Sequence, residues 1–344
     1  MGGLVLDGRP PAREIEARVA ARVAALRRMG GAGSNSGGSS GSAGGDPRAG
    51  GRPPVLAILL VGADRTAARH GQLKERACRR VGMEPLLIAL PGQATTAEVL
   101  VRIDRLAGNT KVDGIFLQHP LPRHVDERLC FDRIPAAKDV GGDSTLSFAR
   151  LAAAAEGDGG AGGSGGAESG FAPATPVAIM RLLAYYGIGV EGKRAVVVGR
   201  SPMVGKPLAL LLLAAHATVT ICHSRTRDLA AAVRRGEVVV GAAGKPELIK
   251  GSWIRDGAVV VDAGYHSRRA GAGGPGGTAA AAAGDVELRE AASRCAAYTP
   301  VPGGVGPMTI AMLLANTVAA AEMSAGAAAA AGALRTGPPP GRPR

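Results

Sequence analysis

Aromatic residues are scarce in this chain, where Phe, Tyr and Trp make up only 3% of the 344 residues. The hydrophobic cores must therefore be built from Val, Leu, Ile and Ala. The same scarcity argues against a nucleic-acid-binding protein, although the formal net charge is +13. Proteins that bind single-stranded nucleic acids stack the bases on aromatic side chains, and the basic residues here are spread along the chain. We expect an affinity for small anionic molecules and no nucleic-acid partner.

Cysteine is also rare, and its spacing argues against two common uses. The four cysteines lie far apart, with no Cys-x-x-Cys pair and no His/Cys spacing typical of a metal site: Cys78, Cys130, Cys222 and Cys295. They are predicted to be buried, reduced thiols, with no disulfide framework and no bound metal. No stretch approaches the roughly 18 uninterrupted apolar residues of a membrane span, and the N-terminus lacks the apolar core of a signal peptide. We expect a cytoplasmic protein with no membrane partner.

Four segments are low in complexity and rich in Gly, Ala, Ser or Pro: Gly30–Gly51, Gly157–Gly170, Ala270–Ala283 and 324–344. Such segments bury too little apolar surface to offset the entropy lost on ordering. We interpret them as flexible loops and a disordered tail. The rest of the chain is long enough for two domains of ordinary size.

Strand-like apolar runs alternate with helical patterns between these segments. The candidate strands are Val55–Val61, Pro85–Leu90, Gly114–Gln118, Ala195–Val198, Thr218–Cys222, Val238–Val240 and Ala258–Asp262. Continuous Val, Ile and Leu runs are typical of parallel strands covered on both faces, and the alternation with helices predicts an α/β fold. Because the strands form two groups, we predict two α/β domains with a cleft between them.

The predicted domain boundaries follow from the same segments. The N-terminal domain is expected to span residues 1–155, and a Rossmann-type dinucleotide-binding domain residues 171–305. A helix at about 306–322 is expected to pack back on the N-terminal domain, ahead of a disordered tail at 324–344.

The sharpest local feature is a Gly-x-Ser-x-x-x-Gly-x-Pro turn between a buried strand and the helix Leu208–Ala215. The free N–H groups at the start of such a helix can hold a pyrophosphate. We assign four residues of this turn to a dinucleotide site: Gly199, Arg200, Ser201 and Gly205. The spacing departs from Gly-x-Gly-x-x-Gly, so a turn without a ligand remains the alternative.

The end of the next strand indicates which dinucleotide binds. About 25 residues after the first glycine, an NAD site carries an acidic residue for the ribose 2′-hydroxyl. Here the chain has His223-Ser224-Arg225-Thr226 instead. A hydroxyl and a guanidinium suit a 2′-phosphate, so NADP is the predicted cofactor; the alternative is that Arg200 and Arg225 are only solvated. Ala243 and Gly244 complete the expected cofactor-binding residues.

A second group of candidate residues lies in the first half of the chain. Asp64–Gly82 is predicted to be a helix with a core stripe at Leu73, Ala77 and Val81. His70 and Lys74 are i, i+4 neighbours on an adjacent face, a pair that is by itself typical of a solvated surface. Gln118 follows a candidate strand and therefore lies at the carboxyl end of the sheet, the usual ligand crevice of open α/β sheets.

Together these segments resemble the bifunctional methylenetetrahydrofolate dehydrogenase/methenyltetrahydrofolate cyclohydrolase family. The matching segments are Val61-Gly62, Lys74, Ala77-Cys78, Gln118-x-Pro-Leu-Pro, Lys138-Asp139-Val140-x-Gly142, Ala174-Thr175-Pro176, Val198-Gly199-Arg200-Ser201, Cys222-His223-Ser224-Arg225-Thr226 and Gly284-Asp285-Val286. The longest match is the eleven-residue run Thr299-Pro-Val-Pro-Gly-Gly-Val-Gly-Pro-Met-Thr309, which chance does not supply. The resemblance covers roughly Leu4–Glu322 apart from the low-complexity loops.

The resemblance implies a tetrahydrofolate site in the cleft, with hydride transfer from the methylene carbon to NADP and hydrolysis of the methenyl product at the same site. Lys74 matches the catalytic lysine of the family, and Gln118 the glutamine that hydrogen-bonds it. A lysine that acts as a base must be partly neutral, which requires burial or a nearby cation. Pro302, Gly303 and Gly304 match the loop that borders the folate. The resemblance also implies a homodimer formed through the Rossmann domains.

Three departures from the family put its activity, but not its fold, in doubt. His70 replaces a tyrosine, Ala67 replaces a serine, and Gly141 replaces the aspartate that holds the pterin ring. Losing a charged hydrogen bond to a substrate typically costs about 1.5–3 kcal/mol. Asp143 would supply a carboxylate if its loop shifted, and a protonated His70 would help to keep Lys74 neutral. The alternative hypothesis is a catalytically weakened paralogue that binds NADP or a folate without efficient turnover.

Overall fold

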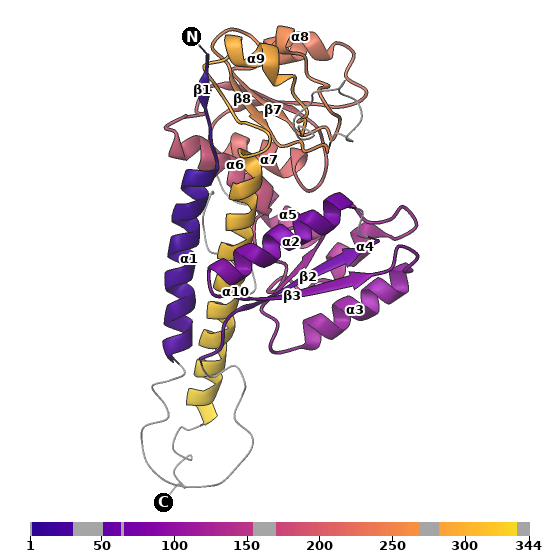
Figure 1. Ribbon diagram of the computed structural model, residues 1–344, viewed down its shortest axis with the longest axis vertical. Helices are drawn as coiled ribbons and strands as arrows, with labels where there is room; N and C mark the ends of the chain where they lie inside the picture. Colours follow the sequence, from indigo (N-terminus) through magenta and orange to yellow (C-terminus); the bar gives the residue numbers. More distant parts are fainter. Residues whose placement is uncertain (1, 30–50, 63–64, 154–169, 268–281, 336–344) are drawn as a thin grey trace, which may run out of the picture. The chain divides into compact units, whose positions relative to one another are not determined.

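The computed structural model describes residues 2–29, 51–62, 65–153, 170–267 and 282–335 (Figure 1). The chain divides into two compact units, each with its own parallel sheet. The three-stranded unit gathers the described residues among 17–140 and 314–335, and the six-stranded unit those among 2–16, 141–153 and 171–313. The prediction of a two-domain α/β fold is confirmed. Most of the three internal low-complexity segments lies outside the described residues.

The three-stranded unit is built around a strand that is buried along its whole length. The strand order is β3-β2-β4, with β2 at Val55–Val61, β3 at Glu84–Leu90 and β4 at Gly114–Leu117. All seven residues of β2 are buried, as expected for an uninterrupted Val/Leu/Ile/Ala run at the centre of a parallel sheet. The helices α2, Arg65–Arg80, and α3, Thr96–Gly108, lie on opposite faces of the sheet (Figure 1). The chain passes from β2 to β3 on one side of β2 and then to β4 on the other side. Because both crossovers are right-handed, their helices must lie on opposite faces of the sheet.

The six-stranded unit is a doubly wound sheet in the order β1-β9-β8-β7-β5-β6, with every strand parallel. Its strands are β1 Leu4–Val5, β5 Arg194–Val198, β6 Thr218–Cys222, β7 Val238–Gly241, β8 Val259–Asp262 and β9 Ala297–Tyr298. The order reverses between β5 and β7, since the chain leaves β5 toward β6 on one side and returns to β7 on the other. Ligands of open α/β sheets bind at such a switch point, beyond the carboxyl ends of the strands.

The remaining helices connect or cover these strands. They are α1 Arg9–Met29, α4 Glu127–Arg133, α5 Thr145–Ala153, α6 Ala174–Tyr185, α7 Gly205–Ala214, α8 Leu229–Arg234, the short 3-10 helix Gly251–Trp253, α9 Leu288–Arg294 and α10 Val305–Arg335. All four cysteines are buried and free, as predicted. Burial raises the pKa of the Cys78 thiol to about 12.

The predicted domain limits differ from the two units in three places, since residues 2–16, 141–153 and 306–313 all belong to the six-stranded unit. The difference at the N-terminus has a structural cause. β1, within the segment assigned by sequence to the first domain, pairs with β9 in the six-stranded sheet. Two residues are too few for a period-two pattern to appear, so neither β1 nor β9 could be predicted. Their pairing places the start of α1 in the six-stranded unit and the rest of that helix in the three-stranded unit.

Helix α10 is longer than predicted. It continues to Arg335, whereas a disordered tail was expected from Ser324; residues 336–344 lie outside the described part of the chain. The added segment is rich in Ala, which has the highest helix propensity of all residues. The Ala-rich and Gly-rich composition was interpreted as disorder, although the residues up to Arg335 form a helix.

By length and composition, one helix within the described residues, Val305–Ala327, is long and apolar enough to cross a membrane. Its apolarity has a local explanation, because Leu314 and Val318 are fully buried. Asn316 donates to the carbonyl oxygen of Val140 at 2.9 Å, and Glu322 pairs with Arg22 of α1. From Leu314 on, α10 is therefore a core helix of the three-stranded unit.

The approach of α10 to the sheet gives a first prediction. A Cβ atom added at Gly114 would lie 2.8 Å from Val140 Cγ1 and 3.2 Å from Thr317 Cγ2, both buried. Gly114→Ala should therefore lower the free energy of unfolding by about 1–3 kcal/mol in urea denaturation. The control is Gly108→Ala at the end of α3, where an added Cβ meets nothing within 4 Å. Equal stability of the two variants would contradict the close packing of α10 on β4.

Candidate active site

A buried lysine and glutamine meet in the three-stranded unit. Lys74 Nζ donates to Gln118 Oε1 at 2.9 Å, and the two residues are 7% and 9% exposed. Lys74 Nζ also lies 4.7 Å from the centre of the Phe116 ring. α2 and β4 thus bring together the two residues that were predicted to be catalytic. The contact places an amine beside an amide oxygen and an aromatic face, away from bulk water.

The buried face of α2 was predicted correctly at Ala77 and Val81 but wrongly at Leu73. Leu73 is 40% exposed, whereas Lys74 is buried together with Ala77, Cys78 and Val81. The prediction considered only apolar residues, so it did not consider a lysine whose aliphatic side-chain carbons are buried. The helix is therefore rotated by about one residue relative to the prediction, which turns Lys74 inward.

The amide of Gln118 has its orientation fixed by a second hydrogen bond. Gln118 Nε2 donates to the carbonyl oxygen of His119 at 2.7 Å, and the backbone N–H of Gln118 donates to Leu59 of β2 at 2.9 Å. Since the NH₂ group is already directed at a carbonyl, the amide oxygen must face Lys74. The residue is therefore an acceptor toward the lysine.

The turn after Gln118 is held by a carboxylate that the sequence did not reveal. Glu127 Oε1 lies 2.6 Å from His119 Nδ1 and accepts the N–H of Leu121 at 3.0 Å. Burial alone would raise the pKa of Glu127, but these two hydrogen bonds outweigh it and the pKa lies below its usual range. Glu127 stands in the first turn of α4, a position that local patterns assign to helix capping. No spacing rule connects it to Gln118.

The other candidates of α2 keep the status of predictions. His70 is half-buried and stands one turn before Lys74, and Ala67 is half-buried one turn earlier. The role assigned to His70, a cation that favours a neutral Lys74, depends on its protonation.

The Lys138–Gly142 motif is largely structural. Lys138 Nζ donates to the carbonyl oxygens of Ala107 and Asn109 at 2.8 and 2.9 Å, and so caps the carboxyl end of α3. Gly142 has φ +70°, and a Cβ there would lie 2.6 Å from the backbone of Phe171 and Ala172.

Gly141 is buried and its carbonyl accepts the N–H of Ala174 at 3.0 Å, while Asp143 is half-buried. Both belong to the six-stranded unit, whereas Lys74 and Gln118 belong to the three-stranded unit. The shift required for Asp143 to replace the missing carboxylate is opposed by the tight packing of Gly142 and by this hydrogen bond. The replacement of the missing carboxylate by Asp143 stays a prediction.

The glycine-rich turn after β5 has the close approach that a dinucleotide site requires. Gly199 has φ +139°, and a Cβ there would lie 1.9 Å from the carbonyl oxygen of Ala242. A Cβ at Gly205 would lie 2.2 Å from the carbonyl oxygen of Gly199. Ser201 Oγ accepts the N–H groups of Val204 and Gly205 at 3.1 and 3.3 Å, at the start of α7. Arg200 is exposed beside this turn.

The turn after β6 carries the residues expected at the ribose. His223 N–H donates to Thr226 Oγ1 at 2.9 Å, and His223 Nδ1 accepts the N–H of Arg225 at 3.1 Å. These bonds fix the backbone and leave Ser224 and Arg225 exposed. Both residues follow the carboxyl end of β6. No acidic residue stands between Cys222 and Arg227 to repel a phosphate.

Two further predicted segments lie in the six-stranded unit. Ala243 and Gly244 follow β7, and their N–H groups both donate to the buried carboxylate of Asp285. Pro302, Gly303 and Gly304 form a loop in which Gly303 accepts the N–H of Gly8 at 2.8 Å and Gly304 N–H donates to Pro300. A Cβ at Gly304 would lie 2.6 Å from Thr299 Cβ, so only glycine fits there.

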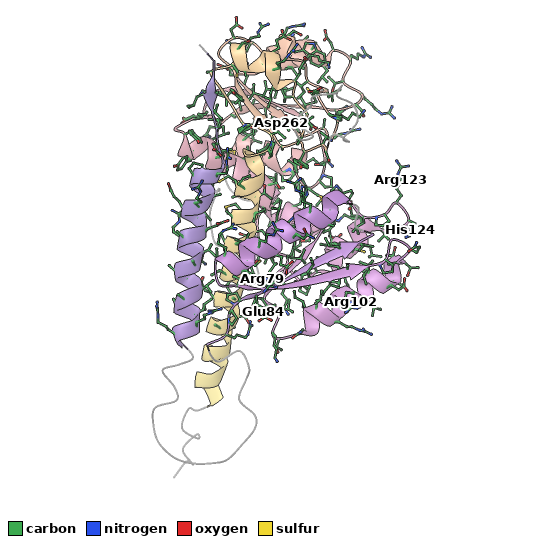
Figure 2. The ribbon with its side chains drawn as sticks, in the orientation of Figure 1. Arg79, Glu84, Arg102, Arg123, His124 and Asp262 are labelled. Carbon is green, nitrogen blue, oxygen red and sulfur yellow. The ribbon has the colours of Figure 1, made fainter. Side chains whose placement is uncertain are left out.

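Within the described ranges, no group of three or more His, Cys, Asp or Glu side chains could hold a metal ion. The residues that the sequence missed are Glu127, Asp262 and Asp285; Asp262, labelled in Figure 2, ends β8. Only the Gly284-Asp285-Val286 match pointed toward one of them.

Comparison with known proteins places these features in one family. Residues 6–141 match the model of the tetrahydrofolate dehydrogenase/cyclohydrolase catalytic domain, and residues 173–325 that of its NAD(P)-binding domain. The chain is 50% identical over 326 residues to the bifunctional protein FolD of Acidobacterium capsulatum, covering 95% of this chain and 100% of that protein. It is 48% identical over 318 residues to FolD of Marinomonas sp., covering 92% and 97%.

Solved structures of proteins from this family superpose on the chain. FolD of Campylobacter jejuni superposes with a TM-score of 0.76 at 34% identity, covering 92% of this chain and 98% of that chain. The Trypanosoma brucei dehydrogenase-cyclohydrolase, solved in complex with NADP cofactor and an inhibitor, superposes with a TM-score of 0.79 at 32% identity, covering 94% and 98%.

The packing of the glycine-rich turn gives a second prediction. Gly205→Ala should weaken dinucleotide binding at least about tenfold, because the added methyl group displaces the Gly199 backbone from the start of α7. The control is Gly189→Ala in the same unit, where an added Cβ meets nothing within 4 Å. Titration calorimetry measures both. Unchanged affinity in Gly205→Ala would exclude this turn from the binding site.

Proposed function

The chain belongs to the tetrahydrofolate dehydrogenase/cyclohydrolase family, and we propose that it oxidises 5,10-methylenetetrahydrofolate with NADP and hydrolyses the methenyl product to 10-formyltetrahydrofolate. The observation that carries the proposal is the buried hydrogen bond between Lys74 and Gln118. The matches to both family domains support two activities in one chain. The 50% identity to a bifunctional protein, over 95% of this chain, supports the same conclusion. Neither the comparisons nor the described site favours the alternative, a weakened paralogue.

We assign the proton-transfer step of hydrolysis to Lys74 Nζ. A neutral amine donates one N–H to Gln118 Oε1, which fixes the direction of its lone pair, and takes a proton from the attacking water with that lone pair. A buried amine loses less solvation than a buried ammonium, so burial favours the form that accepts a proton. Once the proton is taken, the amide oxygen of Gln118 and the ring face of Phe116 stabilise the ammonium.

The residues of the six-stranded unit fit NADP. The tight Gly199 turn and the start of α7 suit the pyrophosphate, and the exposed Arg200, Ser224 and Arg225 suit the 2′-phosphate. When bound, NADP supplies the acceptor for the hydride. The loop of Pro302, Gly303 and Gly304 is proposed to border the folate.

The third prediction tests Lys74. Lys74→Met should lower the cyclohydrolase rate by about 10²–10⁴-fold, because the side chain keeps its volume and loses its proton acceptor. Dehydrogenase activity should survive in part, since hydride transfer needs chiefly the placement of two carbons. The rates are measured separately, with methenyltetrahydrofolate and with methylenetetrahydrofolate plus NADP.

The matched control is the exposed Lys111→Met in the same unit, which should leave both rates unchanged. A Lys74→Met enzyme with an unchanged cyclohydrolase rate would remove Lys74 from the mechanism.

The fourth prediction concerns cofactor choice. In the double variant Arg200→Ala, Arg225→Ala, NADP should bind about 10–100-fold more weakly, because each substitution removes a guanidinium that forms a charge-assisted hydrogen bond to the 2′-phosphate. NAD lacks that phosphate, so its dissociation constant should change less than twofold. Arg289→Ala, on the exposed face of α9, is the control. Equal losses for NADP and NAD would contradict recognition of the 2′-phosphate.

We further propose a cytoplasmic homodimer formed through the six-stranded units. β6 is an edge strand of the six-stranded sheet, and Ile221 on it is 41% exposed. Leu213 of the adjacent α7 is 54% exposed, so apolar surface and unpaired strand edge occur together. An edge with exposed apolar side chains is suited to pair with a second copy.

The fifth prediction tests this surface. Ile221→Lys combined with Leu213→Glu should convert a dimer into a monomer at micromolar concentration, as measured by light scattering. Leu86→Lys, which changes an equally exposed leucine on the edge strand β3 of the other unit, should leave the dimer intact. A wild-type monomer, or a dimer that survives the double change, would refute the proposed interface.

A further inference from the structure

A fully buried carboxylate organises the loop that follows β7. Asp285 is 0% exposed, and its Oδ2 accepts the N–H groups of Ala243 and Gly244 at 2.5 and 2.9 Å. Its Oδ1 accepts the N–H of Lys245 at 3.0 Å and lies 2.8 Å from His266 Nε2. Three successive backbone donors of one loop are thus directed at a single side chain. Charge-assisted bonds of this kind hold a loop in one conformation.

This arrangement determines what the loop can offer a ligand. The N–H groups of Ala243, Gly244 and Lys245 point inward to Asp285, so they are not available to a phosphate. Gly244 is exposed with φ +65°, and nothing lies within 4 Å of the position of a Cβ atom there. Open space therefore lies beside the backbone at Gly244.

The same loop touches the glycine-rich turn directly. A Cβ atom added at Gly199 would lie only 1.9 Å from the carbonyl oxygen of Ala242, so the two backbones are in direct contact. The N–H of Ala242 donates to the carbonyl oxygen of Val198 of β5 at 2.8 Å. A displacement of the residues after Ala242 is therefore transmitted to the turn that begins at Gly199. The two loops stand on β5 and β7, the strands that flank the switch point of the sheet.

Asp285 is itself held by a second buried carboxylate. Asp262 Oδ1 accepts the N–H of Asp285 at 2.9 Å, and Asp262 Oδ2 accepts the N–H of Val286 at 2.8 Å. A Cβ at Gly284 would lie 1.9 Å from Asp262 Oδ2, so the chain passes this carboxylate closely. Burial raises the pKa of Asp262 to about 6, against the opposing effect of these backbone bonds. β8 thus fixes the backbone of Asp285, whose side chain fixes the loop after β7.

We propose that Asp285 is a positioning residue for the dinucleotide: it draws in the N–H groups of Ala243, Gly244 and Lys245 and so sets the loop against which the Gly199 turn closes on the cofactor. His266 supports it at Oδ1, the oxygen that also accepts the N–H of Lys245. The inference rests on the proposed function, because it assumes that a dinucleotide lies at this turn. It assigns Asp285 no contact with substrate or cofactor.

The test compares cofactor binding with a reaction that needs no cofactor. In Asp285→Asn, an amide NH₂ replaces one of the acceptor oxygens, so at least one loop N–H loses its partner while the shape of the side chain is kept. The dissociation constant for NADP, measured by calorimetry on the full-length protein, should rise at least about tenfold. The hydrolysis of methenyltetrahydrofolate without NADP should keep its kcat and KM within about twofold.

Two further variants make the comparison specific. Asp256→Asn, a change at an exposed carboxylate of the same unit that pairs with Arg294, should leave the NADP dissociation constant unchanged. His266→Gln should weaken NADP by an intermediate factor, about threefold. If Asp285→Asn does not fold, His266→Gln carries the same comparison.

Three results would overturn the proposal. These are an unchanged NADP dissociation constant in a folded Asp285→Asn protein, equal losses of NADP binding and hydrolysis, or an Asp256→Asn protein as weak as Asp285→Asn. Failure of the proposed function has a different signature, since the wild-type protein would then bind NADP without any turnover of the folates. Calorimetry still compares the variants in that case, with thermal unfolding as the measure of folding.

Discussion

The proposed chemistry depends on one buried contact, the hydrogen bond from Lys74 Nζ to Gln118 Oε1. An amine that is 7% exposed is stable only where its N–H groups are satisfied, and Gln118 provides an acceptor without a charge. A carboxylate in the same place would hold the lysine as an ammonium and remove its ability to take a proton. The orientation of the amide follows from its second bond to the His119 carbonyl, so the local backbone decides the chemistry of the side chain.

The folds of the two units explain why such groups gather where they do. In both sheets every strand is parallel, so the carboxyl ends of the strands share an edge and the residues that follow them meet there. Gln118 follows β4, Gly199 follows β5 and Ala242 follows β7. Backbone groups freed at these ends are satisfied by neighbouring carboxylates, Glu127 in one unit and Asp285 in the other. The strand ends thus carry both the candidate site and its support.

Features with a periodic or motif signal could be predicted from the sequence. The continuous apolar run of β2 predicted a central parallel strand, and the family motifs located Lys74 and Gln118. In α2, the burial of Ala77 and Val81 was predicted, but the exposure of Leu73 and the burial of Lys74 were not, because lysine is a charged residue type that is rarely buried. Asp285 acts across about 40 residues of sequence, through contacts that exist only once the strands are paired. Glu127 acts across 8 and 6 residues, on His119 and Leu121, within a turn that no spacing rule describes. No local pattern carries that information.

An assay of the purified wild-type protein with 5,10-methylenetetrahydrofolate and NADP decides whether this one chain has two folate activities. Methenyltetrahydrofolate is also assayed alone, without NADP, so that its hydrolysis is followed separately from the formation of NADPH. The account predicts that NADPH accumulates and that methenyltetrahydrofolate, supplied alone, is hydrolysed faster than in buffer. NADP binding with neither NADPH formation nor accelerated hydrolysis would contradict it and would favour a protein that binds without turnover.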